Sequence, residues 1–115
     1  MVLTSPIILE YPLFLIGRLM SQHFGLEQLH MTVYHLVGAG DVRSRLKDAV
    51  VNHFNQISIH NDLPHQLELD FAILVSELNK TGNEAHTLDS LTEDEAEEYA
   101  KKIVQLYEKA IPLIH

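Results

Sequence analysis

The clearest pattern in the chain is the stretch DVRSRLKDAVVNHFNQI, residues 41–57. Its apolar residues recur every three or four positions, and most of its charged residues fall on the remaining surface, as in an amphipathic α-helix. Asp41 precedes this pattern and is a good N-cap, because its carboxylate can accept a backbone N–H of the first turn. The stretch therefore predicts a helix whose inner stripe consists of Val42, Leu46, Ala49, Val50, His53, Phe54 and Ile57.

Two further helices are predicted on the N-terminal side of this stretch. Residues 12–24 begin with Pro12, which is tolerated at a first helical position, and end before Gly25, a residue suited to a left-handed stop. Residues 26–37 repeat apolar side chains at helical spacing and end at Gly38-Ala39-Gly40. A strand over residues 7–16 remains an open alternative, since a short apolar run does not distinguish the two periods.

Two helices are also predicted on the C-terminal side. Asp62 can cap a fourth helix, with Leu63 and Pro64 in its first turn and residues 79–83 at its end. An acidic loop over residues 80–91 follows. Thr92 and Glu95 then match the capping-box pattern and predict a fifth helix, which Pro112 stops.

The length and the connections indicate one small all-α domain. The chain has 115 residues and no internal repeat, and single cores typically take ~100–200 residues. Short connections place consecutive helices side by side, so we expect about five helices in a bundle-like or orthogonal arrangement. The domain spans residues 1–115, with a short N-terminal arm at residues 1–11.

Composition excludes several classes of function. Eight Lys and Arg against sixteen Asp and Glu give a formal charge of −8, which disfavours binding to DNA and other nucleic acids. The chain has no cysteine, which rules out thiol catalysis, zinc-finger sites and iron–sulfur clusters. We expect no membrane segment, because uncharged runs fall well short of the ~20 residues that span a bilayer. Without a convincing targeting segment, the expected location is the cytoplasm.

The segment 12–20 is apolar on nearly every face of its predicted helix. Such a helix must be wrapped by other helices or must meet another chain. We therefore expect a homo-oligomer, most simply a dimer, with an interface formed by Leu13, Phe14, Ile16 and Met20. This surplus of apolar side chains, together with the lack of a convincing catalytic set, predicts a small protein-interaction or regulatory module.

Arg43 and Arg45 form a basic spot on an acidic protein. We expect this spot to bind an acidic segment of a protein partner. The preceding turn Gly38-Ala39-Gly40-Asp41 could instead offer free N–H groups to a phosphate. Against that alternative, Asp41 would occupy the same N–H groups and repel an anion.

An enzyme acting on RNA or nucleotides is the alternative function. Arg18 and His23 match an Arg-x4-His spacing, in which arginine could stabilise charge on phosphorus while histidine moves a proton. The same two residues can equally form the solvent edge of an apolar helix. Cleavage of single-stranded RNA that is unchanged in His23→Ala would remove this alternative.

The chain is rich in histidine, with eight residues of this type. Glu27 and His30 match one Glu-x-x-His element of a bundle di-metal site, but no second element occurs. We therefore expect no metal site and no cofactor. His53 lies within the apolar stripe of residues 41–57, where burial would disfavour its charged form.

Overall fold

All secondary structure in the described residues is helical. In this computed structural model the backbone of residues 13–79, 82 and 84–114 is described, with side chains from residue 20 onward apart from residues 84 and 85. The α-helices follow in the order α2 (Leu13–Leu36), α3 (Val42–Asn52), α4 (Glu68–Leu78), α5 (Glu84–Asp89) and α6 (Glu93–Ala110). Three 3₁₀ turns accompany them: η1 (Phe54–Gln56), η2 (His65–Leu67) and η3 (Ile111–Leu113). The predicted all-α fold is confirmed.

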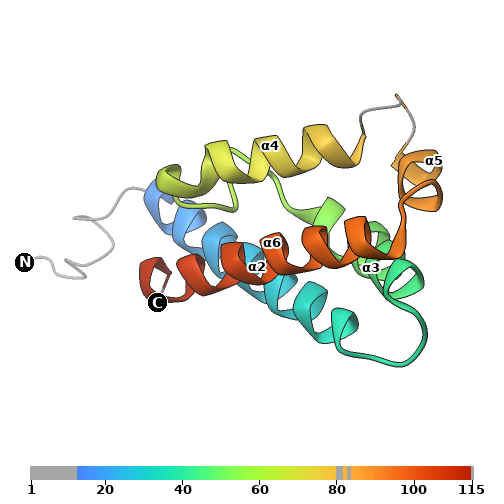
Figure 1. Cartoon of the computed structure of the whole chain (residues 1–115). Helices are drawn as coiled ribbons and strands as arrows, with labels where there is room; N and C mark the ends of the chain where they lie inside the picture. Colours follow the sequence, from blue (N-terminus) through green and yellow to red (C-terminus); the bar gives the residue numbers. More distant parts are fainter. Residues whose placement is uncertain (1–12, 80–81, 83, 115) are drawn as a thin grey trace, which may run out of the picture.

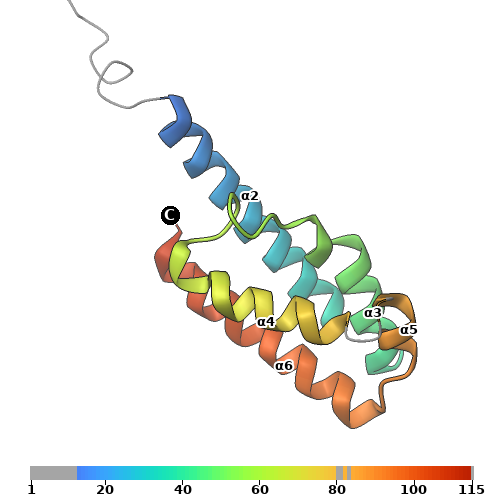
Figure 2. The ribbon, with the colours of Figure 1, turned by 90° about the horizontal axis from the view of Figure 1, so that it is seen from above.

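The helices surround one core. α2, α3 and α6 contact one another, α4 runs beside α6, and α5 lies at the end of the bundle next to α3 (Figures 1 and 2). Each of these helices except α5 is long enough to present an apolar stripe to the others. The largest fully buried side chains include Leu29 of α2, Leu46 of α3, Phe54 of η1, Leu78 of α4 and Ile103 of α6.

The predicted break at Gly25 is wrong, because α2 continues through this residue from Leu13 to Leu36. Gly25 lies where the connection between η1 and η2 crosses the helix (Figure 2). A Cβ at this position would overlap the carbonyl oxygen of Asp62. The glycine therefore allows a close backbone approach in the middle of a helix, and tertiary packing overrides its tendency to end one.

The α-helix within residues 41–57 is shorter than predicted. Asp41 caps it as expected, since its carboxylate accepts the N–H of Ser44 at 3.0 Å. The α-helix stops at Asn52, and η1 follows after His53, whose φ is −130°. The apolar stripe still faces the core, because Phe54 and Ile57 are buried beyond the end of α3.

The predicted role of Asp62 as a helix cap is also wrong. Its carboxylate accepts the N–H of Ser58 at 2.7 Å and so closes the turn that crosses α2. Pro64 adopts an extended conformation with ψ 146°, and α4 begins only at Glu68, after η2. The backbone at Asp62 packs against Gly25 of α2, so the chain crosses α2 before α4 begins at Glu68.

The predicted acidic loop over residues 80–91 contains a helix in its described part. α5 spans Glu84–Asp89, and the buried side chains of Leu88 and Leu91 anchor this segment in the core. Lys47 of α3 pairs with Asp89 at 2.9 Å and holds α5 against α3. Two apolar anchors and one ion pair thus order a segment whose polar sequence predicts a loop.

Two predictions concern the N-terminal region. The arm over residues 1–11 lies outside the described residues. Residues 13–16 belong to α2, so the described part of the strand alternative over residues 7–16 is helical.

The capping box at the start of α6 is confirmed. Thr92 Oγ1 accepts the N–H of Glu95 at 3.1 Å, and the carboxylate of Glu95 accepts the N–H of Thr92 at 2.9 Å. We expect Thr92→Ala to lower the free energy of unfolding by about 1 kcal/mol, measured by urea denaturation. Glu97→Ala, an exposed change within the same helix, should alter it by less than about 0.5 kcal/mol. Equal losses in the two variants would contradict the role of the box.

Candidate functional site

The first turns of α2 project beyond the rest of the bundle (Figure 2). Leu13, Phe14 and Ile16 belong to these turns, and their side chains lie outside the described ones. Where side chains are described, the same helix continues with exposed apolar groups. Met20 is 69% exposed and Phe24 is 43% exposed. Two apolar side chains of α2, Met20 and Phe24, therefore meet solvent just beyond these first turns.

Arg18 and His23 both belong to this projecting helix. The side chain of His23 is exposed, and that of Arg18 lies outside the described ones. Five residues of α-helix rotate the direction of a side chain by roughly 140° from its starting point. This spacing does not by itself align two residues on one face of a helix, and the described residues add no observation in favour of a shared catalytic site.

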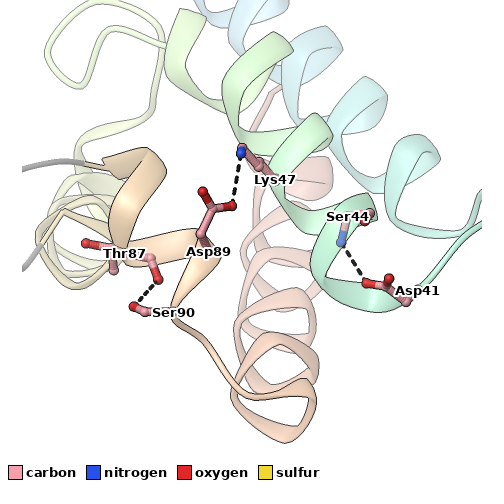
Figure 3. Close-up of polar contacts among 6 residues, drawn as sticks. All are labelled: Asp41, Ser44, Lys47, Thr87, Asp89 and Ser90. Carbon is pink, nitrogen blue, oxygen red and sulfur yellow. Dashed lines mark hydrogen bonds and ion pairs between the residues drawn. The ribbon is translucent and has the colours of Figure 1, made fainter.

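The turn before α3 serves to join two helices. Gly40 adopts a φ of +97°, which glycine tolerates well. The carboxylate of Asp41 accepts the N–H of Ser44 in the first turn of α3 (Figure 3). A hydrogen bond to Ser44 and the positive charge of Arg43 hold the pKa of Asp41 below its usual value, even though desolvation opposes them. A carboxylate thus occupies the N-terminus of α3, where a phosphate would bind.

Figure 3 also shows how this region is tied to α5. Lys47 reaches Asp89, and the hydroxyl of Ser90 donates to the carbonyl of Thr87 at 2.9 Å. The surface beside the start of α3 is therefore built from groups that already bind one another. The Lys47–Asp89 pair links α3 to α5, whereas the Ser90–Thr87 and Asp41–Ser44 hydrogen bonds are local.

The two arginines of the predicted basic spot have different environments. Arg43 is exposed, whereas Arg45 is half-buried. Arg45 Nη1 donates to the carbonyl oxygen of Leu36 at 2.8 Å, which satisfies one acceptor at the C-terminus of α2. Among the described residues, Arg45 Nε is buried and has no hydrogen-bond partner. Residues two positions apart on an α-helix do not face each other. The structure therefore does not bring Arg43 and Arg45 together into one basic spot, and only Arg45 enters the space between the helices.

A pair of histidines lies between α2 and the end of α3. The rings of His35 and His53 stack, with centroids 4.7 Å apart and an interplanar angle of 30°. His53 Nδ1 also lies 3.2 Å from Gln28 Oε1. Burial lowers the pKa of His53, and the nearby His35 lowers it further. The predicted effect of the apolar stripe on His53 is confirmed, whereas the stacked partner, 18 residues away, has no signal in the sequence.

We expect the burial of His53 beside His35 to lower the free energy of unfolding in mild acid. The pKa of His53 is lower in the folded state, so the unfolded chain binds more protons below its ordinary pKa of ~6.5. Above that pH, His53 does not lower the free energy of unfolding. As the pH falls through it, the unfolded chain takes up a proton more readily and the free energy of unfolding decreases. We expect the urea midpoint to decrease from pH 7 to pH 5, and to decrease less in His53→Gln. The exposed His23→Gln should keep the pH dependence of the unchanged chain, and an identical response of both variants would contradict the prediction.

Other histidines make local contacts. His30 Nδ1 lies 3.0 Å from the Tyr107 hydroxyl, and His60 and His65 both approach the carboxylate of Glu68. Across the described ranges, no group of three or more His, Cys, Asp or Glu side chains is arranged to hold a metal ion. None of the helices in those ranges has the length and apolar character that a bilayer crossing requires.

Comparisons with known proteins add no relative. A scan against protein-family models, a search of curated proteins and a search of solved structures each found no match. The class that the structure defines is a small all-α domain.

Proposed function

We propose that the chain is a small protein-interaction or regulatory module that self-associates through the N-terminal half of α2, with the cytoplasm as its setting. The observation that carries this proposal is the exposure of Met20 and Phe24 on a helix that projects from the bundle. The preceding turns have the sequence LFLIGRLM, residues 13–20, which is apolar on nearly every face. Covering Met20 and Phe24 would remove exposed apolar surface from water.

The apolar contribution to such a dimer is comparable in size to the cost of association. Burying Leu13, Phe14 and Ile16 from both copies would contribute roughly 9–18 kcal/mol, at ~1.5–3 kcal/mol for each side chain. Association costs about 4–15 kcal/mol in lost freedom of motion. A two-fold dimer in which the same helix of each copy meets the other is the simplest arrangement, because one patch then serves both sides.

The charge pattern supports the same interface. Between Glu10 and Glu27 the sequence contains one fully charged residue, Arg18. The centres of protein interfaces are depleted in charged residues, so this segment suits such a centre. The net charge of −8 opposes association, and added salt should therefore favour it by screening.

Self-association can be measured by light scattering coupled to gel filtration. We expect the mass of a dimer at micromolar concentration, and at least about tenfold weaker association in Met20→Glu, because a buried carboxylate must be desolvated. Leu69→Glu is the matched control, since Leu69 is 70% exposed on α4, and it should leave the mass unchanged. A sharp monomer mass, or the same weakening by both variants, would disprove the proposal.

A further inference from the structure

An open groove lies at the other end of α2. It is bounded by the end of α2, the start of α3 and the middle of α6, and its volume is about 460 Å³. Its apolar lining includes Val37, Val42, Ala100 and Val104. Val37 is 72% exposed, so this lining meets solvent. A groove of this size is within the range of ligand-binding sites in proteins.

Arg45 lines this groove with unused hydrogen-bonding capacity. A guanidinium has five N–H donors and stays charged at any relevant pH. Arg45 Nη1 donates to Leu36, whereas Nε is buried without a partner among the described residues. A buried donor that is left unpaired costs free energy, and native structures rarely contain one without a reason.

The lysines of the described ranges differ from Arg45 in their ion pairs. Each of them lies within 4.0 Å of a carboxylate, in the pairs Lys47–Asp89, Lys101–Glu98, Lys102–Glu77 and Lys109–Asp70. Neither Arg43 nor Arg45 forms such a pair with any described residue, although the chain has twice as many acidic as basic residues. Of these two arginines, Arg45 is the less exposed and is the one that lines the groove.

We propose that this groove binds a segment of a partner protein in which one Asp or Glu is flanked by apolar side chains. The carboxylate meets the guanidinium of Arg45 in charge-assisted hydrogen bonds. The flanking side chains lie on Val37, Ala100 and Val104. The proposal rests on the protein-binding part of the function above and does not depend on self-association, because the groove is at the opposite end of α2.

The rim of the groove limits which anions fit. Glu97 and Glu108 line it together with Lys101. Two carboxylates and one ammonium repel a polyanion such as RNA, which would need several cations at once. A single carboxylate can be matched by the single guanidinium, while the apolar lining requires apolar groups beside it. The groove therefore favours a protein segment over a nucleic acid.

The first test is a titration of the ¹⁵N-labelled chain with the capped peptide acetyl-SLAELLS-amide, followed by NMR. We expect chemical-shift changes concentrated at the backbone amides of Val37, Ala100 and Val104. The same peptide with glutamine in place of glutamate should bind at least about tenfold more weakly, because it loses the charge-assisted contact. No shift changes up to about 1 mM peptide, which corresponds to roughly −4 kcal/mol, would overturn the proposal, as would equal binding of both peptides.

Variants of the chain provide the second test. Arg45→Gln should weaken binding of the glutamate peptide at least about tenfold. Arg43→Gln removes the same charge from the same helix outside this groove and should change the affinity less than about twofold. Since Arg45→Gln also removes a contact with α2, Val37→Asp gives a second variant at an exposed position, and it should abolish binding while the circular dichroism spectrum is retained. Equal weakening by the two arginine variants, or unchanged binding to Val37→Asp, would overturn the proposal.

Self-association is measured separately from peptide binding. A chain that is monomeric by light scattering and still binds the peptide at the groove disproves the α2 dimer alone. A chain that dimerises and does not bind the peptide disproves the groove proposal alone.

Discussion

Replacing Gly25 with alanine should lower the free energy of unfolding by about 2–3 kcal/mol, the upper end of the usual cost of overpacking. The new Cβ would overlap the carbonyl oxygen of Asp62 and would come within 2.9 Å of its carbonyl carbon. Both are backbone atoms of a turn closed by the Ser58–Asp62 hydrogen bond, so neither can move aside as a flexible side chain would. The loss exceeds the ~1 kcal/mol that alanine normally adds within a helix.

This result is measured by urea denaturation of the purified variant. Gly38→Ala is the control, because a Cβ at that position would meet only the carbonyl oxygen of His35, at 3.4 Å. We expect Gly38→Ala to change the stability by less than about 0.5 kcal/mol. A gain of stability in Gly25→Ala would show that the backbone of Asp62 does not pack closely against α2 at Gly25. It would contradict our explanation of why a glycine occupies the middle of this helix.

Phe54→Ala should have the largest effect on stability, a loss of about 3–5 kcal/mol. Phe54 is fully buried, and its ring lies 4.8 Å from that of Phe71, centroid to centroid. It thus links the end of α3 to α4 across the core. Since small domains are stable by only ~5–15 kcal/mol, the variant should be close to unfolding at 37 °C.

Thermal denaturation followed by circular dichroism measures this loss. Phe54→Leu retains most of the apolar volume and should lose clearly less. Leu69→Ala removes a side chain that is 70% exposed on α4 and should change the stability by less than about 0.5 kcal/mol. If Phe54→Ala were no more harmful than Leu69→Ala, the position of η1 in the core would be wrong.

Local signals explain which parts of the fold are predictable. The Thr92–Glu95 box and the Asp41 cap each involve residues three positions apart, so the pattern and the hydrogen bond lie in the same turn. The apolar stripe of residues 41–57 works in the same way, because the helical period aligns its members on one face. The errors at Gly25 and Asp62 arise where two distant segments touch and each changes the role of the other.

Some features of the candidate sites can be seen in the sequence, and others are visible only in the structure. The apolar excess of residues 13–20 is a property of composition, and exposed Met20 extends it in the structure. The sequence singles out Arg45 as a cation near Arg43. Only the structure shows that Arg45 reaches Leu36, leaves Nε unpaired and lines a groove whose far wall comes from α6.

The sequence by itself determined the helical class, the caps at Asp41 and Thr92 and the apolar excess at the N-terminus, since each of these depends on residues within a few turns of one another. The tertiary structure alone decided that α2 runs unbroken past Gly25, that His35 stacks on His53, and that a groove opens beside Arg45. Those features are contacts between segments far apart in the chain. Their geometry is set by how closely whole helices approach, which no local pattern of residues encodes.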